Sequence, residues 1–230
     1  MKKILYVTTI LTSIAAGALA ETQVSDKNFY VRIDAGKSFA GKVNDSTSNL
    51  AYNHGKLKNS YLLGVGVGTN ISENFRSDLT LSTRNYKLDN NTIEDGDALN
   101  RSQKIKSLTL MINGYYDIEA SDSITPYITA GVGVARNNAG TLVSNLVSNS
   151  PGLLNATYNS KTSTNLAWQI GAGTAFRLSD NTSLDIGYKY VNLGKIKTGA
   201  GVLNPSKLNI SAAKTKLRAQ EITAGIRFDF

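Results

Sequence analysis

Residues 166–190 read LAWQIGAGTAFRLSDNTSLDIGYKY, and this stretch decides the fold. In each half, apolar side chains stand at alternate positions with glycine or polar residues between them. The halves meet at the polar triplet Ser179-Asp180-Asn181. Because side chains of a β-strand point alternately to opposite faces, this period of two predicts two antiparallel strands joined by a tight turn.

The same alternation occurs six more times, which predicts eight strands in all. In each expected strand an apolar face opposes a face of glycine, threonine or charged residues. The further strands are FYVRIDAG (29–36), YLLGVGVGTNI (61–71), FRSDLTLSTRNY (75–86), SLTLMINGYYDI (107–118), PYITAGVGVA (126–135) and LRAQEITAGIRFDF (217–230).

The connections between these strands alternate between short and long. The other short turns surround Ser72-Glu73-Asn74 and Ala120-Ser121-Asp122, whereas the long connections span residues 39–60, 88–103, 137–164 and 193–214. Short periplasmic turns and long extracellular loops are typical of outer-membrane barrels. We therefore expect an all-β fold, an eight-stranded antiparallel transmembrane β-barrel with four long extracellular loops. A soluble β-sandwich, whose polar face would be its wet outer surface, is the alternative.

The face opposite the apolar one carries both signs of charge. Its charged residues are Arg32, Asp34, Arg76, Asp78, Arg84, Asp117, Arg177, Asp185, Lys189, Glu221 and Arg227. An eight-stranded barrel is only wide enough for side chains to fill, and buried charges must be paired. The near balance of acids and bases, with inward glycines leaving room, predicts an ion-paired interior rather than a wide pore.

The first twenty residues resemble a secretory signal. Lys2 and Lys3 precede a mostly apolar stretch from Ile4 to Ala15, and Ala18-Leu19-Ala20 has the small-x-small pattern of a cleavage site. We expect residues 1–20 to be a cleaved signal peptide and residues 21–230 to form one barrel domain; a retained N-terminal anchor is the alternative. The mean hydropathy of −0.19 does not argue against a membrane protein, because alternating strands average to mild polarity.

Composition limits the chemistry of the chain. It has no cysteine and a formal charge of +8, which falls by two, to +6, when Lys2 and Lys3 are removed. A basic chain favours polyanionic partners, and for an exported protein without a binding motif nucleic acid is not expected. His54 is the only histidine, and no cluster has metal-ligand spacing. We therefore expect no enzyme, no metal and no cofactor; His54 is interpreted as a solvated surface residue.

Two of the long connections carry candidate binding residues. The fourth has no acidic residue from Asn192 to Gln220, and its cations could bind acidic host proteins, heparan chains or lipopolysaccharide phosphates. The third carries leucine and valine among serine and asparagine; exposed apolar residues can mark a protein contact, or they can form a loop core or extend the strands. The candidate ligand-binding residues are Lys195, Lys197, Lys207, Lys214, Lys216, Leu146, Leu153 and Leu154. A merely solvated basic loop is the alternative.

The chain ends on Phe228-Asp229-Phe230, which resembles the C-terminal signal read by the barrel-insertion machinery of Gram-negative outer membranes. Together with ITPYITAGVGVA (124–135), residues 166–190 and EITAGIRFDF (221–230), it is similar to the small outer-membrane barrels that include the OmpA transmembrane domain and the opacity-type antigens. The chain length and Asn/Lys-rich loops most resemble the Adr-type adhesins of rickettsiae. That resemblance implies attachment to host cells and capture of serum proteins such as vitronectin.

Three functions follow from these features. The first is a surface adhesin that binds a host protein, vitronectin or a cell-surface receptor, through its long loops while its barrel contacts outer-membrane lipid and lipopolysaccharide. The second is a structural barrel without a specific ligand. The third, which a charge-filled lumen and the absence of a histidine–acid constellation disfavour, is a small channel or lipid-modifying enzyme.

Overall fold

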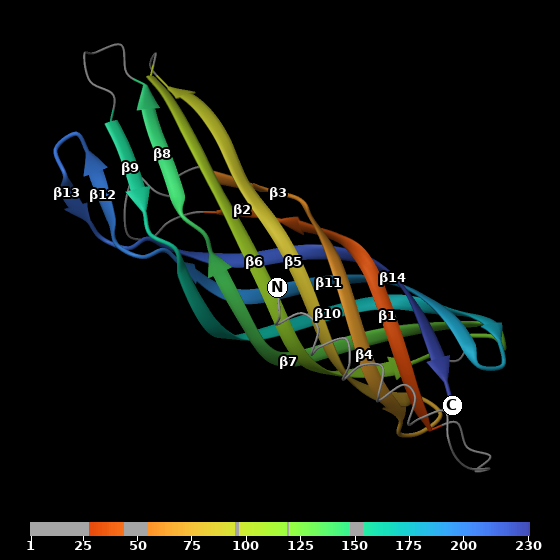
Figure 1. Ribbon diagram of the computed structural model, residues 1–230. Coiled ribbons are helices and arrows are strands. Elements are labelled where there is room, and N and C mark those ends of the chain that lie inside the picture. Colours follow the sequence, from red (N-terminus) through yellow and green to blue (C-terminus); the bar gives the residue numbers. More distant parts are fainter. Residues whose placement is uncertain (1–27, 44–54, 95–96, 119, 148–153) are drawn as a thin grey trace, which may run out of the picture.

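The computed structural model describes residues 28–43, 55–94, 97–118, 120–147 and 154–230 (Figure 1). The expected signal peptide lies outside these ranges. None of the described segments forms a helix long and apolar enough to cross a membrane.

Eight antiparallel strands close into a ring, as the sequence predicted. Each strand pairs with the next along the chain, and the last pairs with the first, so that Val31 lies opposite Phe228. Because the ring is closed, every strand of the wall has a neighbour on each side with which its backbone can form hydrogen bonds. Backbone polar groups need such partners in hydrocarbon, where water is absent. The ring strands are β1 (Phe29–Ala40), β4 (Ser60–Asn70), β5 (Phe75–Glu94), β6 (Asp97–Asp117), β7 (Ile124–Ala139), β10 (Lys161–Ser179), β11 (Thr182–Lys197) and β14 (Lys214–Asp229).

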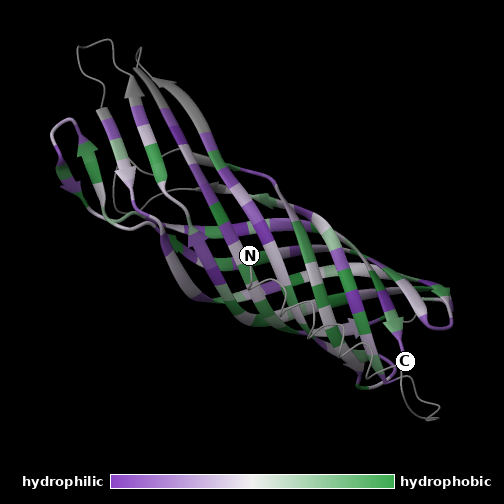
Figure 2. Ribbon diagram, viewed as in Figure 1, coloured by the Kyte–Doolittle hydropathy of each residue, from purple (hydrophilic) through white to green (hydrophobic). Residues whose placement is uncertain are grey.

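The predicted alternation of faces is confirmed along these strands. In β1, Ile33 is 62% exposed on the outer wall, whereas its neighbour Arg32 is 2% exposed in the lumen. Figure 2 shows apolar and polar residues alternating along the barrel strands. This arrangement, with charged side chains inside and leucine outside, is the reverse of that in a soluble protein. It is stable only where the outer wall is in contact with lipid rather than water.

Aromatic side chains mark both ends of the outer apolar band. Near the short turns Phe75 packs against Tyr116, with ring centroids 5.0 Å apart. Toward the long connections Trp168 packs against Tyr190 at 5.7 Å. Tyrosine and tryptophan rings, which carry a polar group, favour the membrane–water interface, so Tyr116 at one end and Trp168 and Tyr190 at the other indicate the limits of the hydrocarbon region.

The long connections are largely strands, which corrects the bounds expected from sequence. Residues 88–103, expected as a loop, are mostly a continuation of β5 and β6 to the pair Glu94 and Asp97. The third and fourth connections add a side sheet to the far part of β6, in the order β8–β9–β12–β13 (Figure 1). The added strands are β2 (Lys42–Val43), β3 (Gly55–Lys58), β8 (Leu142–Val147), β9 (Leu154–Tyr158), β12 (Gly201–Asn204) and β13 (Leu208–Ile210).

The interior has two layers. Charged and hydroxyl side chains fill the half of the lumen near the short turns. The half toward the long connections holds an apolar plug that continues under the side sheet and includes Leu57, Leu88, Ile105, Leu142, Tyr158, Val191 and Leu217. One apolar cluster therefore packs both inside the barrel and beneath the extracellular extension.

Candidate functional site

Arg32 is the centre of one buried ion cluster in the lumen. Its Nη2 lies 2.6 Å from Oδ1 of Asp34 and its Nη1 lies 3.4 Å from Oδ2 of Asp78. The same Nη1 donates a hydrogen bond of 2.9 Å to the hydroxyl of Tyr115. Inward positions of β1, β5 and β6 thus meet across the lumen, so the guanidinium neutralises two carboxylates that could not be buried alone.

Arg76 sits below this cluster, nearer the short turns. Its Nε donates to Oδ2 of Asp117 at 2.8 Å, and its Nη2 lies 3.7 Å from Oδ1 of Asp185. The guanidinium carbon also lies 4.2 Å from the ring centroid of Tyr115 and 4.9 Å from that of Tyr127. Two aromatic faces and two carboxylates therefore compensate one buried cation.

Arg84 forms a third cluster, at the boundary with the apolar plug. It makes a two-pronged pair with Glu221 from β14, in which Nη2 lies 2.9 Å from Oε2. Its Nη1 donates to Thr109 at 3.0 Å and to Ser82 at 3.2 Å, and Ser38 donates to Glu221 at 2.8 Å. Planar pairing of this kind is the strongest geometry for an ion pair between side chains.

A small cavity of about 20 Å³ lies among the clusters and is lined in part by Lys189, Gln169 and Asn113. Gln169 donates to Asn113, and Asn113 donates to Asp78, each at 2.6 Å. The cavity has room for about one water molecule. A separate open vestibule of about 1000 Å³ lies at the short turns.

The structure brings together most, but not all, of the charges expected inside. Arg227 pairs with Asp229 at 3.3 Å. Arg177 is exposed beside the vestibule rather than buried, because it stands where β10 leaves the lumen for the Ser179 turn. Among the described residues Lys189 has no carboxylate oxygen within 4.0 Å, although it is buried.

This filled lumen leads to a prediction about conductance. We expect the refolded chain to give no stable open steps in a planar lipid bilayer, because three ion clusters and the apolar plug occupy its cross-section. A porin reconstituted in the same way serves as the positive control. Discrete, reproducible openings from the purified folded chain would contradict the prediction.

Four of the five candidate lysines lie on the barrel wall rather than on a loop. Lys195 and Lys197 belong to β11, and Lys214 and Lys216 are their partners in β14. Lys207 alone lies in a turn, between β12 and β13, with a φ of 52°. Leu153, the side chains of Leu146 and Leu154, and His54 lie outside the described residues.

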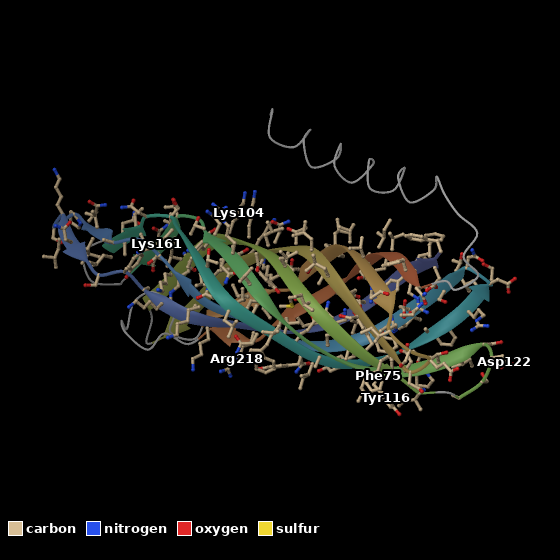
Figure 3. All side chains as sticks on the ribbon, turned by 90° about the horizontal axis from the view of Figure 1, so that it is seen from below. Phe75, Lys104, Tyr116, Asp122, Lys161 and Arg218 are labelled. Atoms are coloured by element: carbon tan, nitrogen blue, oxygen red, sulfur yellow. The ribbon has the colours of Figure 1, made fainter. Side chains whose placement is uncertain are left out.

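Three of the wall lysines, Lys195, Lys214 and Lys216, are part of a larger set that we call the basic belt. Each member points outward and is exposed, beyond the apolar band of its strand on the side of the long connections. Figure 3 shows two members, Lys104 and Arg218, on opposite sides of the barrel, away from the end that carries Phe75, Tyr116 and Asp122. The belt consists of Lys37, Lys58, Lys87, Lys104, Lys106, Arg136, Lys195, Lys214, Lys216 and Arg218.

The C-terminal aromatics of the predicted insertion signal lie on the outer wall. Phe228 and Phe230 are both partly exposed, and Phe228 lies between Val31 of β1 and Thr182 of β11. Their use as an insertion signal stays a prediction.

The side sheet ends in a narrow hairpin. β12 pairs with β9 on one side and with β13 on the other, and β13 has no second neighbour in the described sheet. Leu208 is 60% exposed at the start of β13, next to Lys207 in the turn. This edge was not predicted, because residues 193–214 were expected to form a loop and show no strand pattern.

Comparison with known proteins gives the same architecture. The family model described as "Outer membrane protein beta-barrel domain" matches residues 7–230. A protein of Rickettsia bellii (strain OSU 85-389) named "Putative adhesin" is 30% identical over 234 residues, and the match covers all of both chains. A protein of Rickettsia prowazekii (strain Madrid E) with the same name is 29% identical over 236 residues, and the match covers 99% of each chain. The crystal structure of Neisserial surface protein A is similar at a TM-score of 0.52 and 17% identity, covering 90% of this chain and all of that one.

Proposed function

Because this chain belongs to the outer-membrane β-barrel family and lies in the outer membrane with its long connections at the cell surface, we propose that it is an adhesin that binds host cells or a host serum protein such as vitronectin. The observation that carries this proposal is full-length similarity to rickettsial relatives that bear the name adhesin. The barrel resemblance alone supports only the fold.

The side sheet is the part of the molecule best suited to such binding. It projects beyond the barrel mouth (Figure 1), and the apolar cluster that fills the barrel continues beneath it. Its last strand, β13, offers an unpaired edge, an exposed Leu208 and the cation Lys207. Strand edges bind extended segments of other proteins through main-chain hydrogen bonds, and an apolar anchor beside a charge adds specificity.

We therefore expect the double variant Lys207→Gln, Leu208→Ser to lose affinity for vitronectin by about tenfold, the loss typical of removing one well-placed contact at an interface. Binding of the refolded full chain to immobilised vitronectin and to cultured host cells measures this. Arg177→Gln, on the opposite rim of the barrel, is the matched control and should bind as the original chain does.

Two other results of the binding measurement would change this proposal. Binding that survives the double variant would retain the adhesin and exclude the β13 edge as its site. If folded protein bound neither vitronectin nor host cells, the adhesin proposal would fail and a structural role in the envelope would be the better explanation. Folding is checked by the mobility shift between unheated and heated samples on a denaturing gel.

A further inference from the structure

Four asparagine residues, here called the asparagine row, lie side by side across the side sheet and the end of β6. Asn100 of β6 lies opposite Asn145 of β8. Asn145 in turn lies opposite Asn155 of β9, and Asn155 lies opposite Asn204 of β12. Neighbouring strands are about 4.8 Å apart, so the row extends over about 14 Å.

The asparagine row is on the outer face of the sheet, away from the apolar cluster. The residues that alternate with it, among them Arg101, Ser144 and Ala156, are buried on the inner face. The asparagines themselves are half-buried or exposed. A second row lies beside them on the outer face and consists of Ser102, Val143, Thr157, Val202 and Asn209. Neither row contains a charged or an aromatic side chain.

Folding of the sheet does not account for the asparagine row. Asparagine is disfavoured in strands, so four of them in register lower the stability of the side sheet. Stacked asparagines can offset this cost when they form hydrogen bonds with one another. Here the Oδ1 atoms of Asn145 and Asn155 are buried and have no hydrogen-bond partner, although the two residues lie directly opposite each other. An unpaired amide oxygen carries a desolvation cost that a donor from a ligand would remove.

The chemistry of the outer face indicates the class of ligand. Each carboxamide has a donor and an acceptor, and its terminal torsion turns easily, so the oxygen can be brought to the surface. Sugar hydroxyls both donate and accept hydrogen bonds, and the C–H faces of sugar rings can pack on small apolar side chains such as Val143 and Val202. Because the two rows contain no cation, an uncharged glycan fits them better than a sialylated or sulfated one. A protein partner fits less well, since the cores of protein interfaces are enriched in aromatic residues.

We propose that the asparagine row and the row beside it bind an uncharged glycan, whose hydroxyls donate hydrogen bonds to the amide oxygens of Asn145 and Asn155. This site goes beyond the adhesin proposal, because it lies on the outer face of the side sheet rather than at the β13 edge and binds a sugar rather than a protein segment. The side sheet extends past the mouth of the barrel, where glycans of a host cell are within reach (Figure 1).

A printed glycan array tests the proposal. The full chain is refolded in detergent, and its binding to neutral oligosaccharides that end in mannose, galactose or N-acetylglucosamine is compared with its binding to sialylated and sulfated oligosaccharides. We expect binding to neutral oligosaccharides. In the variant Asn145→Val, Asn155→Val, the affinity for the best-bound of them, measured by titration calorimetry, should fall by about thirtyfold, the effect of losing two hydrogen bonds of ordinary strength. Valine favours strands, so the side sheet should be retained.

Two control variants separate this site from other parts of the molecule. Asn28→Ala, Asn181→Ala removes two exposed amides from the opposite rim and should bind the same oligosaccharide as the original chain does. Lys207→Gln, Leu208→Ser should also retain glycan binding, so that a failure of the β13 site and a failure of the glycan site can be told apart. The mobility shift on heating shows that each variant is folded.

Three results would overturn the proposal. If the folded original chain bound no neutral oligosaccharide, the outer face would have no glycan ligand. Binding restricted to sialylated or sulfated oligosaccharides would assign sugar recognition to cations instead. Binding unchanged by the two valine substitutions would place the site elsewhere on the molecule.

Discussion

Arg84→Met is expected to lower the free energy of unfolding by about 3–5 kcal/mol, because it breaks a buried ion pair by removing only one partner. The guanidinium is buried and pairs with Glu221 through two hydrogen bonds, so its removal leaves a carboxylate in the lumen without its cation. Methionine keeps much of the volume, which separates the loss of charge from the loss of packing. Urea unfolding of the chain refolded in lipid vesicles measures the change.

The matched control removes both charges. Arg84→Met, Glu221→Leu should recover most of the stability, because replacing a whole buried pair by apolar side chains is close to neutral. The hydroxyls left behind still have partners, since Ser38 contacts Tyr86 at 2.6 Å and Ser82 contacts Thr109 at 2.7 Å. If the double variant is as unstable as Arg84→Met, the pair is not the source of the effect.

The second large effect is expected from Gly173→Ala on the inner wall of β10. A Cβ at this position would lie 2.5 Å from the Tyr127 hydroxyl and 2.5 Å from the carbonyl oxygen of Ile186. One added methyl group must therefore displace both a buried ring and a neighbouring strand. We expect a loss of about 1–3 kcal/mol, the usual cost of overpacking, again by urea unfolding in vesicles.

The chain contains the control for this substitution. Gly114 lies on the outer wall, and a Cβ there meets no atom within 4 Å. Gly114→Ala makes the same chemical change in another barrel strand and should leave stability unchanged or slightly higher. Equal losses at the two positions would show that glycine is needed in these strands for a reason other than space beside Tyr127.

Strands could be predicted from the sequence within the membrane but not beyond it, where both faces of the wall can be in contact with water. Within the membrane one face of a strand must be apolar, so the period of two is visible and gives the eight strands and their faces. Beyond the membrane both faces meet water or a small core, and a strand such as KLDNNTIE (87–94) has the composition of a loop although its hydrogen-bond ladder continues. For this reason the side sheet and its β13 edge were not predicted.

The candidate residues illustrate the same difference. Alternation placed Arg32, Asp78 and Glu221 in the lumen, but it contains no information on partners, since Arg84 and Glu221 are brought together only when β5 and β14 curve around the same interior. Likewise, the sequence indicated that the lysines of the fourth connection form a basic loop. Strand pairing places four of them on the outer wall, where Lys195 lies opposite Lys216 and Lys197 lies opposite Lys214.

By itself, the sequence determined the class of fold, the number of strands in the barrel ring and which side chains face lipid, because each depends on local periodicity and on the contrast between apolar and polar faces. The tertiary structure alone decided which buried charges pair, that an apolar plug and a side sheet complete the extracellular end, and that scattered lysines form one belt. Those features depend on strand register and barrel closure, which bring together residues far apart in the chain; no local pattern records them.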